Sequence, residues 1–395
     1  MKRLAQKFKS VPLLVRIIVA IAAGALLGLV APAVMVRVMN TFCSLFSQLL
    51  GFMIPLIIVG LVTPAIARVG KGAGRMLFIT ALVAYTFTVL SGLFAYGFST
   101  TLFPAFVDAT SIHALEAEET LFAPYFSISI PPLMEVMTAL VASFMLGLGI
   151  AAYDAQQMRG FFEEFEQIVT RTISKVIIPL LPLFIFGLFM DMAASGKVGP
   201  VLTAFLKIIV IIFLMTILLL MLQYVIAGLI TRRNPLQSLL RMLPAYFTAL
   251  GTSSSAATIP VTLKQTLSNG VRSEIAGFVV PLCATIHLSG STLKITSCAI
   301  ALMLMQGVPV DFMQMLGFVL MLGVTMVAAP GVPGGAIMAA LGILESLLGF
   351  DPSQQAMMIT LYIAMDSFGT ACNVTGDGAI ALIMDKVAGK SVTKK

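Results

Sequence analysis

Long apolar runs dominate the pattern of hydrophobic and polar positions along the chain. A helix needs about 20 apolar residues to cross the hydrocarbon core of a bilayer, and six runs in the first part of the chain meet this requirement. Residues 105–131 form a polar extracellular loop, and residues 154–173 have the pattern of an amphipathic helix leading along the membrane surface into the fifth run. The six predicted crossings lie near residues 12–31, 43–67, 76–104, 133–153, 174–194 and 199–231.

Beyond residue 233 the apolar runs become shorter and are interrupted by small and polar residues. Residues 235–268 contain two half-length apolar segments around GTSSSAATIP, and residues 310–349 contain two around AAPGVPGGA. Irregular backbone at membrane depth is tolerated only where it is buried in protein or lines a water-filled cavity. We therefore interpret both segments as re-entrant hairpins whose tips border a cavity.

A helix of spanning length is predicted after each hairpin. Residues 273–306 are interrupted by HLSGST, and residues 354–386 carry a stripe of polar residues. The first hairpin opens to the cytoplasm and the second to the outside, an inverted arrangement typical of transporters that bind substrate near the midplane. The predicted fold is an all-α polytopic membrane protein with eight transmembrane helices and two re-entrant helical hairpins, arranged as inverted repeats.

Composition agrees with this fold. The chain of 395 residues is 59% hydrophobic and 10% charged, with a mean hydropathy of +1.04, whereas a soluble domain is about 25% charged. The net charge of +7 comes from basic residues in short loops, which indicates cytoplasmic loops and not a nucleic-acid partner. We expect a multi-pass protein of the plasma or inner cell membrane, in contact with lipid, with a retained first helix and both termini cytoplasmic.

A polar stripe runs along the last predicted helix, where Asp366, Thr370, Asn373 and Asp377 recur at helical spacing. At about 100° per residue they fall within roughly 60° of one another, along about 16 Å. A charge at the bilayer centre costs about 2.5–3.5 kcal/mol, so both carboxylates must meet cations or donors. The stripe predicts a site for a ligand and an ion. The alternative is a buried network that only joins helices.

Three further polar features lie at the same depth. The consecutive serines of GTSSSAATIP lie where helices end, and helix N-termini attract anions, which favours a carboxylate site. The break beside His287 frees carbonyl groups that suit Na⁺; alternatively, His287 is a core residue bonded to a carbonyl. Lys294 lies on nearly the same face as His287 and requires an acidic partner or an anionic ligand; alternatively, its side chain snorkels towards a helix end.

Four ordered motifs carry a resemblance to a known family. They are TSSSAATIPVT, PLCATIHLSGST, APGVPGGAIM and DSFGTACNVTGD, and they fall within residues 235–385. These motifs resemble the signature regions of the dicarboxylate/amino acid:cation symporters, the family of the glutamate and neutral amino acid transporters. The resemblance implies cation-coupled symport of a small amino acid by a homotrimer. It also implies an elevator mechanism in which the second hairpin is the outer gate.

The resemblance also divides the chain into two parts. It implies a static scaffold formed by helices 1 and 2, in residues 1–75, and by helices 4 and 5, in residues 105–195, which include the extracellular loop. It implies a mobile transport domain formed by helix 3, residues 76–104, and by residues 196–395. The latter contain helix 6, both hairpins and the last two helices.

Substrate contacts follow by position from the same resemblance. It implies that Asp366 binds the amino group of the substrate and that Thr370 and Asn373 contact the substrate. It implies that Ser255 and the amides near Ser253 hold the α-carboxylate, with backbone contacts from the second hairpin. The substrate-binding candidates are Ser253, Ser254, Ser255, Ser291, Lys294, Gly331, Val332, Asp366, Gly369, Thr370 and Asn373.

The resemblance implies sodium ligands as well. One site would take Asp377, Asn373 and carbonyl groups of Cys283 and His287, and Thr285 would belong to a second. Tyr85 and Thr88 would remain from a third, which is incomplete because His287-Leu288-Ser289-Gly290-Ser291 lacks the asparagine and aspartate of the family motif. His287, whose side chain has an unperturbed pKa of about 6.5, could carry H⁺ instead. No organic cofactor is predicted.

Gly369 departs from the acidic amino acid members of that family, in which an arginine at this position holds the side-chain carboxylate of the substrate. Glycine here favours a neutral amino acid. Alternatively, Lys294 replaces the arginine and binds an acidic amino acid or a dicarboxylate, or it pairs with Asp366 and blocks an amino group. Arginine and lysine are not interchangeable at a bidentate site, so these alternatives stay open.

Two other classes of protein compete with a transporter. An intramembrane aspartyl protease needs two carboxylates that share a site from opposing elements, but Asp366 and Asp377 lie about three turns apart on one predicted helix. An enzyme is therefore not expected. A channel-like or sensory membrane protein without coupled transport is the alternative class.

Overall fold

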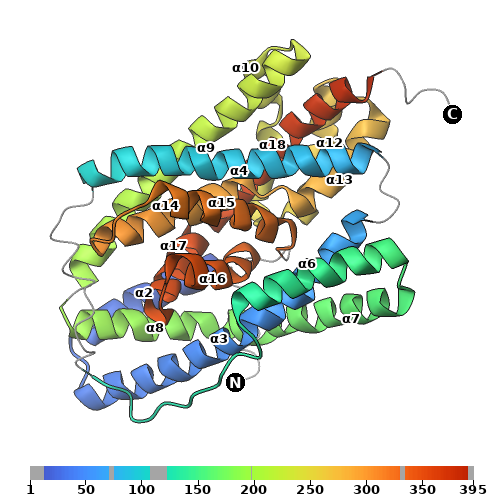
Figure 1. Ribbon diagram of the computed structural model, residues 1–395. Helices are drawn as coiled ribbons and strands as arrows, with labels where there is room; N and C mark the ends of the chain where they lie inside the picture. The colour runs from blue at the N-terminus through green and yellow to red at the C-terminus, as the bar shows by residue number, and fades with distance from the viewer. Residues whose placement is uncertain (1–12, 71–74, 107–121, 197, 330–333, 390–395) are drawn as a thin grey trace, which may run out of the picture.

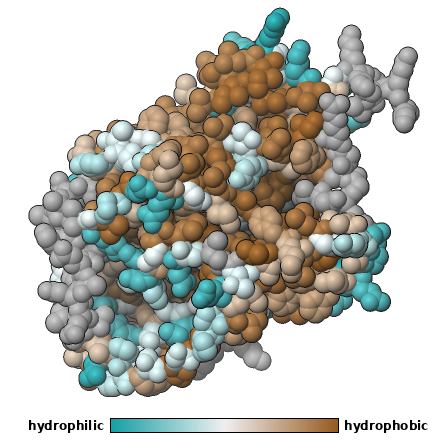
Figure 2. Space-filling model, in the orientation of Figure 1, coloured by the Kyte–Doolittle hydropathy of each residue, from teal (hydrophilic) through white to brown (hydrophobic). Residues whose placement is uncertain are grey.

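The computed structural model describes residues 13–70, 75–106, 122–196, 198–329 and 334–389, and every regular element within these ranges is a helix (Figure 1). Five helical stretches of this described part are long and apolar enough to cross a membrane. They are Ala33–Ala67, Met76–Phe106, Gln156–Ala194, Val198–Thr231 and Ser273–Met305. Figure 2 shows broad apolar surface on one face, with hydrophilic side chains gathered towards the lower left.

One group of helices comes from the first half of the chain. Helix α2 packs against α8, and α3 packs against α6, α7 and α8. The amphipathic α7 continues through a turn of π-helix, η1, into α8 without leaving the helical state, as its pattern predicts. The group comprises α2 (Leu13–Gly28), α3 (Ala33–Gly70), α6 (Val136–Tyr153), α7 (Gln156–Thr172), η1 (Ile173–Ile177) and α8 (Ile178–Ala194).

A second group surrounds the last helix, α18, which packs against α9, α11, α12, α13 and α14. Helix α4 packs along α14, and α15 packs against α16 and α4. The group comprises α4 (Arg75–Phe106), α9 (Val198–Thr231), α10 (Pro235–Arg241), α11 (Leu243–Thr252), α12 (Ser255–Ser268), α13 (Ser273–Ile286), α14 (Ser289–Met305), α15 (Phe312–Val327), α16 (Gly335–Leu348), α17 (Pro352–Ala364) and α18 (Asp366–Val387). Helices α15, α16 and α17 make most of the contacts with the first group.

The interrupted segments are sets of short helices in the structure. Helices α10 to α12 form the first hairpin, α13 and α14 form the broken helix, and α15 and α16 form the second hairpin. The tip of that second hairpin, residues 330–333, lies outside the described residues, and so do Gly331 and Val332. Most of the polar loop predicted at 105–131 is likewise outside them, because residues 107–121 are not described.

The last predicted helix, residues 354–386, is wrong in one respect: it is two helices, not one. The chain leaves helical geometry at Met365, between α17 and α18. The Met365 carbonyl accepts a hydrogen bond from the Lys294 ammonium, 3.2 Å away, in addition to bonds from Phe368 and Gly369. The break places Asp366 in the first turn of α18, where the helix dipole stabilises a negative charge.

Two glycines set the spacing between α2 and α8. Gly24 and Gly28 lie one turn apart on the buried face of α2. A Cβ atom at Gly24 would overlap the Phe186 carbonyl, and one at Gly28 would overlap the Met190 carbonyl. Small residues at this spacing allow close approach of two membrane helices, so these glycines fix the α2–α8 distance.

We expect Gly28→Val to destabilise the protein by about 1–3 kcal/mol, because overpacking must push α2 away from α8. The chain contains no tryptophan, so thermal unfolding is best followed with a thiol-reactive dye that reports exposure of the buried Cys283, Cys298 and Cys372. Gly97→Val is the matched control, because nothing lies within 4 Å of a Cβ at that position. Equal melting temperatures for the two variants would contradict the packing argument.

Candidate functional site

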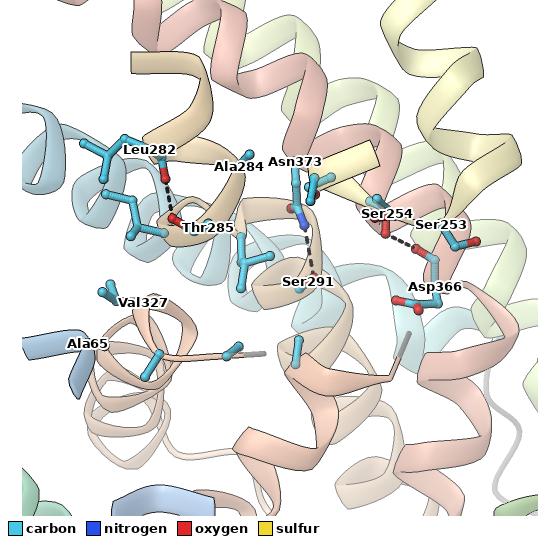
Figure 3. Close-up of a pocket in the computed structure, with 18 of the residues that line it drawn as sticks. Ala65, Ser253, Ser254, Leu282, Ala284, Thr285, Ser291, Val327, Asp366 and Asn373 are labelled. Atoms are coloured by element: carbon cyan, nitrogen blue, oxygen red, sulfur yellow. Dashed lines mark hydrogen bonds between the residues drawn. The ribbon is translucent and has the colours of Figure 1, made fainter. Parts of the chain in front are cut away.

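A cavity of about 460 Å³ lies where the first hairpin, the break between α13 and α14, the second hairpin and α18 meet (Figure 3). Ala65 of α3 and Val327 of α15 contribute apolar wall. In Figure 3 Asp366 lies beside the serines of the first hairpin, and Asn373 lies above Ser291. The polar lining residues are Ser253, Ser254, Ser255, Thr285, Ser291, Tyr362, Asp366, Thr370 and Asn373, together with Glu166 of α7.

The serine-rich tip of the first hairpin brings a helix N-terminus to this cavity. Ser253 adopts a left-handed conformation (φ 49°), which ends α11. Ser254 is the N-cap of α12, and its Oγ accepts a hydrogen bond from the Ala257 N–H at 3.3 Å. The Ser253 and Ser367 hydroxyls share a hydrogen bond of 2.7 Å that ties the tip to α18. The start of a helix with hydroxyls around it is suited to an anion such as a carboxylate.

The break between α13 and α14 is held by α18. The Gly290 N–H, at the start of α14, donates to Asn373 Oδ1 at 2.8 Å, and Asn373 Nδ2 donates to Ser291 Oγ at 3.3 Å. Tyr362 donates its hydroxyl to the same Ser291 Oγ at 2.9 Å. A Cβ at Gly290 would lie 2.7 Å from the Gly369 carbonyl, so only glycine permits this close approach.

His287 and Asp377 form a buried pair behind the break. His287 Nδ1 lies 2.9 Å from Asp377 Oδ1, and both side chains are excluded from solvent. In the described part of the chain His287 Nε2 and both amide atoms of Gln223 have no hydrogen-bond partner. Gln223 Oε1 and His287 Cε1 lie side by side against Gly376, where both would overlap a Cβ atom. Such unsatisfied buried polar atoms are uncommon in proteins and indicate a place for a small polar species.

Lys294 fills the space beside Gly369. A Cβ at Gly369 would overlap the Lys294 Cε and Nζ atoms. The ammonium lies 3.6 Å from Asp366 Oδ1 and 3.8 Å above the centre of the Tyr362 ring. The other oxygen of Asp366 accepts a hydrogen bond from the Gly334 N–H at 3.1 Å. Asp366 is therefore held by a cation on one side and by the second hairpin on the other.

Several candidates lie away from the cavity. Lys294 borders a separate, small hollow with Phe213, Met365 and Phe368. The Cys283 carbonyl accepts the His287 N–H at 2.9 Å. Tyr85 donates to the Leu320 carbonyl at 3.2 Å, and Thr88 donates to the Ala84 carbonyl within its own helix at 2.9 Å.

Thr285 lines the far end of the cavity, where its hydroxyl donates to the Leu282 carbonyl at 2.7 Å. Two further residues of the site, Tyr362 and Gln223, were not singled out from the sequence. Gln223 carried a usable signal, because it is a polar residue inside the apolar run 199–231. Tyr362 carried none, since a tyrosine in an apolar segment is most often part of the core.

Two hairpins and two broken helices meet around one polar cavity, an arrangement found in secondary transporters with inverted repeats. The chain belongs to the sodium:dicarboxylate symporter family, whose model matches residues 13–387. The family is described as one of sodium:dicarboxylate symporters, and the curated relatives reported below carry the names of amino acid transporters.

Two curated relatives show how far the similarity extends. The chain is 29% identical to excitatory amino acid transporter 1 of Rattus norvegicus over 246 aligned residues. This alignment covers 61% of this chain and 45% of that protein. The chain thus matches less than half the length of that relative. It is 26% identical over 409 aligned residues to the serine/threonine transporter SstT of Streptococcus thermophilus (strain CNRZ 1066), across the whole of both chains.

Asn373→Ala should destabilise the protein by about 1–3 kcal/mol, because it leaves the buried Gly290 N–H without an acceptor. The melting temperature of the purified protein measures this effect. Thr375→Ala is the matched control, since the Thr375 hydroxyl is also buried on α18 but has no hydrogen-bond partner among the described residues. If the two alanine variants lower the melting temperature equally, the hydrogen bond does not hold the break.

Proposed function

We propose that this protein is a cation-coupled symporter that binds a small organic carboxylate in the cavity between the two hairpins. The observation that carries the proposal is the meeting of the α12 N-terminus with the polar face of α18. The first hairpin supplies hydroxyls and a helix N-terminus for the carboxylate. Thr370 and Asn373 offer neutral polar contacts to the rest of the solute, and Gly331 and Val332 remain candidates for backbone contacts.

The identity of the solute rests on Gly369 and Lys294. The missing side chain at Gly369 favours a neutral amino acid, and the name of the serine/threonine transporter supports that choice. An acidic amino acid or dicarboxylate is the second candidate, with Lys294 as the cation for its second carboxylate. Lys294 does not line the cavity, so this role would require its side chain to leave Asp366.

The coupling cation is proposed to act at the buried pair behind the break. Asp377, Asn373, Thr285, His287 and the Cys283 carbonyl are the candidate Na⁺ ligands, and the family supports sodium as the coupling ion. Tyr85 and Thr88 direct their hydroxyls to carbonyl groups elsewhere, which weakens the case for a further site there. H⁺ carried by His287 is the alternative.

The transport cycle is proposed to be of the elevator kind. The group of α2, α3, α6, α7 and α8 would be the static scaffold, and the group around α18 would move across the membrane. Their contacts run mainly through α15, α16 and α17, which supports a sliding surface there. The proposal also includes a homotrimer with eight membrane crossings in each chain. It further includes an outer gate at the second hairpin and cytoplasmic termini.

Uptake into proteoliposomes tests the function directly. Purified protein is reconstituted, and accumulation of radiolabelled amino acids and organic acids is measured under an inward Na⁺ gradient, an inward H⁺ gradient or neither. Concentrative uptake that requires one of the gradients is expected. Uptake that only equilibrates the solute, with no dependence on either gradient, would instead indicate the channel-like class.

We expect Asp377→Asn to raise the cation concentration for half-maximal uptake on the order of tenfold, because it removes the buried charge nearest the proposed ion site. The preference among solutes should change less. Asp311→Asn is the control, since Asp311 is an N-cap, a position where asparagine is equally suited. An unaltered cation dependence in the Asp377 variant would remove Asp377 from the ion site.

A further inference from the structure

The charges around the cavity are unusual for a site that binds an amino acid. Among the described lining residues the charged side chains are Glu166 and Asp366, both negative. Asp366 lies beside the hairpin tip that suits a carboxylate (Figure 3). Its charge is already matched by Lys294, which approaches from the side away from the cavity.

Lys294 is fixed in that position. Lys294 belongs to α14, and its side chain is fully buried. Its ammonium is surrounded by Asp366 Oδ1, the Met365 carbonyl and the face of Tyr362. A buried ammonium that loses its partner is strongly destabilised. Each of its three neighbours comes from α17, α18 or the break between them, so the lysine is part of the structure that forms the α17–α18 junction.

The pairing changes what Asp366 can bind. A substrate ammonium at Asp366 would be a second cation on one carboxylate, close to the Lys294 ammonium, and like charges so placed repel each other by several kcal/mol. A hydroxyl group carries no charge and donates a hydrogen bond to a carboxylate oxygen without this repulsion. The Asp366–Lys294 pair therefore disfavours an amine and accepts a neutral donor.

We infer that Lys294 is a specificity-determining residue whose ammonium already occupies Asp366, and that the site therefore prefers a small 2-hydroxy monocarboxylate to the neutral amino acid that Gly369 alone would favour. This inference rests on the proposed function. The carboxylate binds at the α12 N-terminus, and the hydroxyl donates to Asp366. A second carboxylate on the solute would meet no lysine or arginine in the described lining, which restricts the class to monocarboxylates.

The test compares matched solutes that differ only in this group. Full-length protein in proteoliposomes is given L-lactate or L-alanine, and L-malate or L-aspartate, under Na⁺ and H⁺ gradients. Wild-type protein is expected to take up lactate at least about tenfold better than alanine, and better than malate. Preferential uptake of alanine, aspartate or malate by the wild type overturns the inference.

Lys294→Met should reduce the lactate-to-alanine ratio by about tenfold or more, because it leaves Asp366 free to bind an ammonium. Lys264→Met, on an exposed position of α12, is the control and should leave the ratio unchanged. A ratio that is the same in wild type and in Lys294→Met reduces Lys294 to a structural role and refutes the inference. A merely structural role would lower uptake of all solutes together.

Two further arms keep the outcomes separate. Lys294→Gln retains a donor for the Met365 carbonyl and serves if the methionine variant does not fold; it should show the same loss of selectivity. The wild-type comparison needs no variant and decides on its own. Gradient-driven uptake of alanine in preference to lactate refutes the inference but supports the proposed symport, whereas failure to accumulate any of the four solutes contradicts both.

Discussion

A charge inside a bilayer must be met by an opposite charge or by several hydrogen-bond donors or acceptors. The ion pair between the buried Lys294 and Asp366 meets this requirement inside the protein. The pair joins α14 to α18. The Lys294 ammonium also donates to the Met365 carbonyl at the end of α17, and the lysine side chain fills the space beside Gly369. Together with the Ser253–Ser367 hydrogen bond and the Gly334 N–H on Asp366, this pair holds the polar face of α18 beside the first hairpin.

Interrupted helices supply the rest of the site. Three breaks converge on the cavity: the tip between α11 and α12, the extended residue His287 between α13 and α14, and Met365 between α17 and α18. Each break exposes backbone groups that need partners in the absence of water. Asn373 accepts the Gly290 N–H and Lys294 donates to the Met365 carbonyl, so two of these groups are satisfied from within the protein.

The sequence was a good guide to the helices and a partial guide to their interactions. Apolar runs and small-residue interruptions predicted both hairpins and the broken helix, because bilayer thickness limits how long a spanning segment can be. The break at Met365 was missed, since no glycine or proline marks it and the Lys294 side chain that donates to its carbonyl comes from another helix. The spacing of Asp366 and Asp377 predicted a shared face, but the partner of each carboxylate came from another element and could not be deduced from spacing.

Positions 294 and 369 share one volume, which constrains the order in which the two residues could change. Any side chain at position 369 would overlap the Lys294 Cε and Nζ atoms, whereas loss of the lysine leaves Asp366 with the Gly334 N–H and opens room beside Gly369. A larger residue at position 369 therefore becomes possible once the lysine has been replaced. Under the proposed function, the specificity of the site can change first at Lys294 and then at Gly369, and the reverse order is blocked by overlap.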